Sequence, residues 1–148
     1  MNPEIRWNLS DEEREKLSPM MTRAWNYYLS IDSFWGNDRP CKTSCVTPDM
    51  VEKDEIFAAY IDGSPVGMCA LRGMRSRIPV VVLDDVWVEP DHRREGIASK
   101  LVTAALEYAR EKGVTVNAWV LSGNDVAKDF YSKLNLLDKP LTTCYRIL

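Results

Sequence analysis

The chain has 148 residues, a formal net charge of −3 at pH 7 and an ordinary globular composition, with 45% hydrophobic and 28% charged residues. This length predicts a single domain over residues 1–148 that needs neither disulfides nor metals to fold, and the acidic balance argues against a nucleic-acid partner, which usually selects a basic surface. No apolar run reaches the about 20 residues of a membrane span and the polar start lacks the character of a targeting segment, so we expect a cytoplasmic protein without a membrane partner.

The first predicted elements are a short strand and a long helix. Residues 3–8 have the composition of a strand, and residues 10–31 that of a helix. Ser10 can cap this helix, and Glu13 stands three residues later, which gives the sequence of a capping box. Pro19 should break or kink the helix, because proline lacks the backbone N–H that a helix interior needs.

The centre of the chain changes to the two-residue period of strands. Residues 55–73 hold two apolar runs around Asp62-Gly63, which is a strong signal for a hairpin. Residues 78–90 predict a long strand that ends at a proline. Residues 96–113 predict a helix with one apolar stripe, and Gly113 stands where helices prefer to end.

The last third continues the alternation of strand and helix. We expect a strand over residues 114–121, a helix over 124–134 and a final strand over 142–148. The strand–helix–strand connection around residues 78–121 demands a parallel pair, whereas the hairpin gives antiparallel pairs. The sequence therefore predicts an α+β fold, or α/β mixed sheet, with helices on its faces.

The junction between the long strand and its helix suits a phosphate group. A helix N-terminus leaves backbone N–H groups unpaired and carries partial positive charge, so it attracts anions. Gly96 and Ala98 leave room for the approach, and Arg93 and Arg94 add positive charge. The segment lacks the ending of a Walker loop and the third glycine of a dinucleotide fingerprint. A plain strand-to-helix turn with solvated charges is the alternative.

Two motifs in this half of the chain resemble those of the GNAT superfamily, the acetyl-coenzyme A-dependent N-acetyltransferases. Arg93-x-x-Gly96-x-Ala98 follows the strand exit Val88-Glu89-Pro90, and Asn124 stands seven residues before Tyr131. Where the family usually has Gly-Phe after the tyrosine helix, this chain has Asn135-Leu136. Asparagine also accepts a left-handed helix cap, so the cap can survive this change.

The resemblance covers about residues 80–136 and implies a GNAT-like fold, with a central twisted mixed sheet of about six to seven strands and about four helices. It implies transfer of an acetyl group from acetyl-coenzyme A to a primary amine that attacks the thioester directly. The residues it places at the coenzyme are Val86, Trp87, Val88, Arg93, Arg94, Glu95, Gly96, Ile97, Ala98, Ser99, Asn124 and Tyr131. Backbone N–H groups near Val86, Trp87 and Val88 would polarise the thioester carbonyl.

Three side chains are candidates for proton transfer. By resemblance Tyr131 is the acid that protonates the leaving thiolate; a half-buried tyrosine on an amphipathic helix is the alternative. Asp84 and Asp85 lie in an otherwise apolar strand, where successive side chains face opposite sides, so one of them could face the amine and act as base. A structural acid at a strand bulge is the alternative, and Glu89 is a weaker third candidate.

The acceptor side is less defined by the sequence. Aromatic residues in the first part of the chain can hold an ammonium by cation–π attraction or simply form core and loop: Trp25, Tyr27, Tyr28, Phe34 and Trp35. Three arginines could meet a carboxylate or the coenzyme 3′-phosphate, or be solvated: Arg72, Arg75 and Arg77. The acceptor is expected to be a small-molecule or peptide amine, and a homodimer is compatible with the resemblance. A non-catalytic acyl-coenzyme A-binding regulatory module is the alternative function.

The cysteines do not predict a metal site. Of the four, only Cys41 and Cys45 are close in sequence, and the chain has one histidine, His92. A zinc site would need four ligands at finger-like spacing. We therefore expect no metal and reduced thiols, with a regulatory Cys41–Cys45 disulfide as the alternative.

Overall fold

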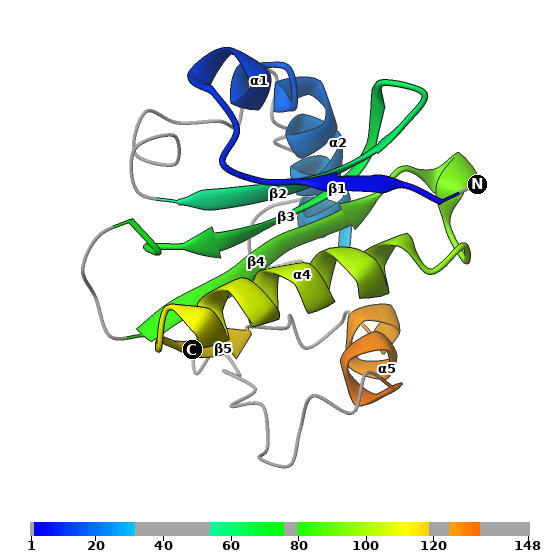
Figure 1. Cartoon of the computed structure of the whole chain (residues 1–148). Helices are drawn as coiled ribbons and strands as arrows, with labels where there is room; N and C mark the ends of the chain where they lie inside the picture. Colours follow the sequence, from blue (N-terminus) through cyan, green and yellow to red (C-terminus); the bar gives the residue numbers. More distant parts are fainter. Residues whose placement is uncertain (1, 32–53, 76–79, 119–124, 134–148) are drawn as a thin grey trace.

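The structure is a computed structural model that describes residues 2–31, 54–75, 80–118 and 125–133 (Figure 1). Its sheet has five strands in the spatial order β1-β2-β3-β4-β5 within these residues. The strands are β1 (Glu4–Arg6), β2 (Glu55–Ile61), β3 (Ser64–Arg72), β4 (Val80–Val88) and β5 (Thr115–Ala118). Neighbours from β1 to β4 are antiparallel, and β4 and β5 are parallel. This arrangement confirms the predicted mixed sheet.

Helices cover both faces of the sheet. The four α-helices in the described part of the chain are α1 (Asp11–Glu15), α2 (Ser18–Ile31), α4 (Ile97–Glu111) and α5 (Asp125–Lys133), and a short 3-10 helix, η2 (Pro90–His92), follows β4. The sequence led us to expect about six to seven strands, and the described residues form five. The strand predicted over residues 142–148 lies outside them. No helix in the described ranges is long and apolar enough to cross a membrane.

The N-terminal helix is divided at the predicted place. Glu13 N–H donates to Ser10 Oγ at 3.2 Å and Ser10 N–H donates to Glu13 Oε2 at 2.8 Å, which confirms the capping box. Helix α1 ends at Glu15 and α2 begins at Ser18, so Pro19 lies in the first turn of a new helix. Proline is tolerated in a first turn, because the N–H it lacks would have no partner there.

The predicted hairpin is also confirmed. Asp62 and Gly63 form a two-residue loop, and both have positive φ, 50° and 77°. Such a loop matches the right-handed twist of the flanking strands, and Asp-Gly is one of the sequences that adopts it readily. The hairpin aligns β3 with β2 and so fixes the strand against which β4 is laid.

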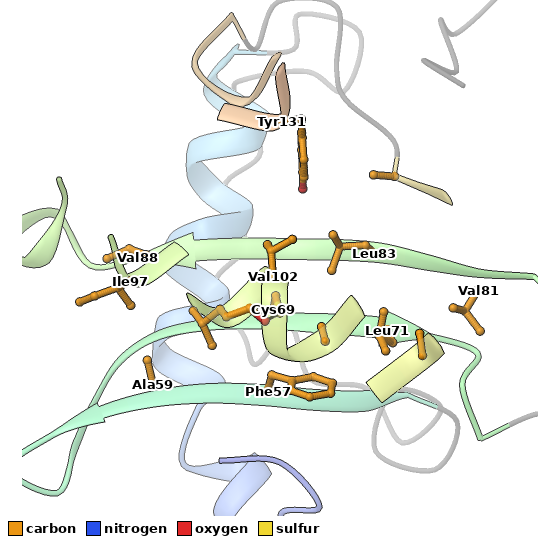
Figure 2. Packing of buried hydrophobic residues seen from close by; sticks show 14 of the residues in the cluster. Phe57, Ala59, Cys69, Leu71, Val81, Leu83, Val88, Ile97, Val102 and Tyr131 are labelled. Atoms are coloured by element: carbon orange, nitrogen blue, oxygen red, sulfur yellow. Dashed lines mark hydrogen bonds between the residues drawn. The ribbon is translucent and has the colours of Figure 1, made fainter. Parts of the chain in front are cut away.

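Apolar clusters on both faces of the sheet hold the layers together. On one face, α4 packs on the sheet through a cluster that includes Phe57, Cys69, Leu71, Val81, Leu83, Leu101, Val102 and Tyr131 (Figure 2). On the other face, Met20, Met21 and Ala24 of α2 pack with Met68 and Trp87 of the sheet. Strand β4 contributes side chains to both clusters, because it lies between these two helical layers.

Candidate active site

Strand β4 contains a bulge at the predicted acidic pair. Trp87 pairs with Met68 and Asp84 pairs with Ala70, so one β3 residue, Cys69, lies opposite two β4 residues. One of these two, Asp85, has a φ of 53°, which is uncommon for a residue with a side chain. A bulge adds a residue to one strand and redirects the side chains that follow.

The effect of the bulge is visible in the packing of β4. Val81 and Leu83 belong to the cluster under α4. Strict alternation would send Trp87 to the same face as these two, but Trp87 packs against α2 with Met68. The second half of β4 is therefore out of phase with the first half.

Both carboxylates of the pair reach one guanidinium. Arg72 Nη2 donates to Asp85 Oδ2 at 3.0 Å, and Arg72 Nε lies 3.0 Å from Asp84 Oδ2. Asp84 Oδ1 also accepts a hydrogen bond of 2.8 Å from the backbone N–H of Asp85. The simple expectation that the two acids face opposite sides is wrong in this respect, because the bulge lets both contact Arg72.

These contacts give the two acids different properties. One oxygen of Asp84 accepts the backbone hydrogen bond at the bulge and the other pairs with Arg72, and the side chain is 38% exposed. Asp85 is 6% exposed, and burial, followed by the charge of Asp84, raises its pKa to about 6, against the attraction of Arg72. A carboxyl group with a pKa near neutrality can accept and release a proton at physiological pH. Of the two, Asp85 has the properties of a base.

Tyr131 of α5 is buried beside this strand. Its hydroxyl is directed toward β4, near Val102 (Figure 2). Burial raises its pKa, and the nearby Cys69 and Asp84 raise it further. The phenol is therefore protonated at neutral pH, as a proton donor must be. Burial likewise raises the pKa of the Cys69 thiol, so this free cysteine is a protonated part of the core.

The turn after η2 has the backbone that an anion site requires. Arg94 and Gly96 have positive φ, 64° and 78°, and Gly96 is the N-cap of α4. A Cβ at Gly96 would meet no atom within 4 Å, so the position selects glycine through its φ and leaves open space beside it. The first turn of α4 holds no acidic residue that would repel an anion. These features fit a pyrophosphate approaching the helix N-terminus.

The side chain of Arg93 faces back toward the sheet. Its Nε donates to the carbonyl of Val88 at 2.9 Å, and its guanidinium lies 4.6 Å from the ring centre of Trp87 and 6.0 Å from that of Tyr27. The arginine thus joins the turn to the end of β4 and to α2. Its predicted contact with the coenzyme stays a prediction.

Glu89 is held at the exit of β4. Arg23 of α2 binds its carboxylate through Nε at 3.1 Å and through Nη2, and the indole Nε1 of Trp87 donates to it at 3.4 Å. The carboxylate therefore ties α2 to the strand. The contacts thus give Glu89 a structural role at the strand exit.

The remaining predicted residues are distributed around these groups. Val86 is half-buried under α4, Val88 and Ile97 are buried in the same cluster, Ala98 and Ser99 are half-buried, and Arg94 and Glu95 are exposed. Within the described residues, β5 accompanies β4 only from Val80 to Leu83. The side chain of Tyr28 and several predicted residues lie outside the described part of the chain: Phe34, Trp35, Cys41, Cys45, Arg77 and Asn124.

Sequence reasoning missed the role of Arg72. It was grouped with Arg75, which instead binds Glu55 through Nε at 3.2 Å. The signal that could have separated them is the pair of acids in an apolar strand, since buried carboxylates call for a cation nearby. Among the described residues, no three His, Cys, Asp or Glu side chains gather as a metal site would need.

Comparison with known proteins places this geometry in a family. The model of the Acetyltransferase (GNAT) family matches residues 12–136. Over 94 residues the chain is 32% identical to an uncharacterized N-acetyltransferase of Methanocaldococcus jannaschii, and the aligned region covers 60% of this chain and 41% of that protein. Over 90 residues it is 37% identical to an uncharacterized N-acetyltransferase of Archaeoglobus fulgidus, and this aligned region covers 57% of this chain and 61% of that protein. The matches thus span between about two fifths and three fifths of these relatives.

A solved structure shows the same fold. The PaiA N-acetyltransferase of Thermoplasma acidophilum, in complex with coenzyme A, superposes with a TM-score of 0.68 at 21% identity, covering 90% of this chain and 88% of that one. The fold and the family match agree with the resemblance seen in the sequence. The chain belongs to the acetyltransferase (GNAT) family.

Proposed function

We propose that the protein is an N-acetyltransferase that moves the acetyl group of acetyl-coenzyme A to a primary amine by direct attack on the thioester. The observation that carries this proposal is the placement of a buried acid and a protonated tyrosine around one strand bulge. Asp85 lies at the bulge, and Tyr131 lies close enough to Asp84 and Cys69 for both to raise its pKa. Perturbed titratable groups on the strand that leads into a turn suited to an anion are typical of an active site.

The two groups can serve two of the proton transfers of the reaction. Asp85 takes the proton of the acceptor ammonium, directly or through a water molecule, and leaves a neutral amine. The amine nitrogen forms a bond to the thioester carbon, the carbon–sulfur bond breaks, and the nitrogen loses its second proton to solvent water to give the neutral amide. Tyr131 gives its proton to the departing thiolate and is reprotonated from solvent.

The turn before α4 would bind the coenzyme. Its backbone N–H groups and the start of the helix would hold the pyrophosphate, with Gly96 allowing close approach. The complex of the Thermoplasma neighbour with coenzyme A supports coenzyme A as the ligand of this fold. The roles of Arg93, Asn124 and the backbone near Val86 stay predictions, as do the cytoplasmic location, the homodimer and the choice between a small-molecule and a peptide amine.

The first experiment is a calorimetric titration with acetyl-coenzyme A, followed by measurement of thiol release across a panel of primary amines. We expect binding and amine-dependent release. Binding without release from any amine would instead support the acyl-coenzyme A-binding regulatory module. No binding would contradict the assignment of the turn.

A tyrosine variant then tests the acid. Tyr131→Phe should lower kcat about 100-fold or more, because a positioned general acid contributes roughly 10²–10⁴-fold, while the Kd for acetyl-coenzyme A stays within about twofold. Tyr108→Phe is the matched control, since this tyrosine of α4 is also partly buried but packs on Phe57 and feels the charges of Glu55 and Arg75, not those of the bulge acids. Unchanged turnover in Tyr131→Phe would remove Tyr131 from the mechanism.

A further inference from the structure

The only described cation in contact with the β4 bulge belongs to the neighbouring strand. Arg72 is the last residue of β3 and pairs with Val82, two residues before the acids begin. Its guanidinium contacts Asp84 through Nε and Asp85 through Nη2, each at 3.0 Å. One planar group thus lies within ion-pair distance of two carboxylates at a fixed spacing, which the compact ammonium of a lysine would not reproduce.

The bulge is an unfavourable place for two acids. The positive φ of Asp85 is costly for a residue with a side chain, and it persists only where the surroundings enforce it. Neighbouring carboxylates also repel each other, and Asp85 is almost fully buried. Two contacts counter these costs: the bond from the Asp85 N–H to Asp84, and Arg72.

We propose that Arg72 is a positioning residue for the acetyl transfer: by binding both acids of the bulge, it fixes the direction of the Asp85 carboxylate and keeps it ionised for the acceptor amine. This inference rests on the proposed function, in which Asp85 is the base. Arg72 acts through Asp85 and needs no contact with either substrate.

The other charged groups around Asp85 do not substitute for Arg72. Asp54, directly before β2, and Asp84 of β4 both add negative charge near Asp85. On α2, which packs against β4, Arg23 is occupied by Glu89 at the strand exit. The neutral titratable neighbours are Cys69 on β3, whose pKa is raised by burial and by the charge of Asp85, and Tyr131 on α5, whose pKa is raised by burial and by the charge of Asp84.

Removing the guanidinium should therefore be felt first in the titration of Asp85. An opposite charge within about 4–6 Å usually lowers the pKa of a carboxyl by about 1–3 units, so losing it raises the pKa by a similar amount. In Arg72→Gln, the acid limb of the pH profile of kcat/KM, where activity falls as Asp85 is protonated, should shift to higher pH by at least about one pH unit. The KM for acetyl-coenzyme A should stay near that of the wild type. Arg72→Lys keeps the positive charge but loses the planar guanidinium with its two donor positions. Its acid limb should stay closer to that of the wild type, while kcat falls.

The matched control is Arg75→Gln. This arginine follows the same strand and binds a buried carboxylate, that of Glu55, and it is not among the charges that shift the pKa of Asp85. It should lose folding stability without moving the acid limb. An equal shift of the limb in Arg75→Gln, or a wild-type limb and rate in Arg72→Gln, would overturn the proposal. If Arg72→Gln does not fold, Arg72→Lys carries the test through its loss of kcat at an unchanged limb, and wild-type kcat in that variant would overturn the proposal.

A second readout separates this inference from the proposed function. The ¹³C signal of the Asp85 carboxyl, assigned with Asp85→Asn, can be titrated in the full-length protein without any substrate. We expect its midpoint to rise in Arg72→Gln and not in Arg75→Gln. If the wild type showed no amine-dependent thiol release, the proposed function would fall, while this titration would still report whether Arg72 controls the charge of Asp85. An unchanged midpoint in Arg72→Gln would refute the inference even in an active enzyme.

Discussion

The two halves of β4 differ in backbone regularity and in the charge they bury. From Val80 to Leu83 the strand is regular, pairs with β3 on one side and β5 on the other, and places Val81 and Leu83 in the core under α4. From Asp84 to Val88 it is bulged, contains a positive φ, and carries a buried acid paired with Arg72. Burying a charge and straining the backbone both cost stability. The difference fits the proposed function, in which the first half serves the fold and the second half serves the chemistry.

The largest effect is expected from neutralising the acid of the second half. Asp85→Asn keeps the size of the side chain but cannot accept a proton, so kcat should fall roughly 10²–10⁴-fold, equivalent to about 3–5 kcal/mol. In the wild type, kcat/KM should fall as the pH drops through about 6, because the base becomes protonated. Steady-state kinetics across pH 5–9 measures both. A variant that kept wild-type turnover would show that Asp85 is structural.

The next effect concerns stability and its dependence on pH. The folded-state pKa of Asp85, about 6, lies above the ordinary value of 3.8. A raised carboxyl pKa means that the folded protein binds the proton more tightly than the unfolded chain, so the contribution of Asp85 becomes less favourable as the pH rises from about 4 to about 6. This loss amounts to about 3 kcal/mol, at 1.36 kcal/mol for each pKa unit.

Urea denaturation of the wild type and Asp85→Asn at several pH values isolates this contribution. The difference in the free energy of unfolding between the two should change in favour of the variant across that range and level off above it. A difference that is constant with pH would mean that Asp85 has an ordinary pKa in the folded protein.

A smaller effect, of another kind, is expected in the regular half. Val81→Ala removes buried methyl groups from a fully buried side chain and should lower the free energy of unfolding by about 1–3 kcal/mol. The turnover of the folded enzyme should stay within about twofold, since Val81 lies three residues before the acids. Denaturation and kinetics on the same sample check both. A drop in kcat comparable to that of Asp85→Asn would erase the distinction between the two halves.

The smallest effect is expected at the exit of the strand. Glu89→Gln weakens the ion pair with Arg23, in which the Arg23 side chain is 55% exposed and that of Glu89 17%, and a pair screened by solvent on one side is worth about 1 kcal/mol. We expect a shift of no more than a few degrees in Tm and little change in kcat. A large loss of kcat here, with an active Asp85→Asn, would transfer the role of base to Glu89.

Features set by local rules could be predicted from the sequence. The capping box of Ser10 and Glu13, the Asp62-Gly63 hairpin and the end of α4 before Gly113 each depend on a few neighbouring residues. The acid pair and the tyrosine were also found as candidates. The mixed sheet followed from the order of these elements.

The bulge and the role of Arg72 could not be predicted in the same way. A bulge is a relation between two strands, and the strict alternation assumed for β4 fails once Cys69 faces two residues. Arg72 and Arg75 look alike in sequence, and the register decides which of them meets the acids. For the same reason, the contact of Arg93 with the ring of Trp87 was not foreseen.

The extra residue in β4 also limits how the length of this strand can change. Deleting Asp85 would leave Cys69 opposite Val86 alone and restore an unbroken alternation with Trp87 still facing α2, whereas adding one residue would turn Trp87 toward α4. The turn that precedes α4 begins directly beyond, and it would be displaced with the strand. Insertions and deletions should therefore be tolerated in the Asp62-Gly63 hairpin far more readily than between Asp84 and Val88, which gives a way to map the site by scanning chain length instead of side chains.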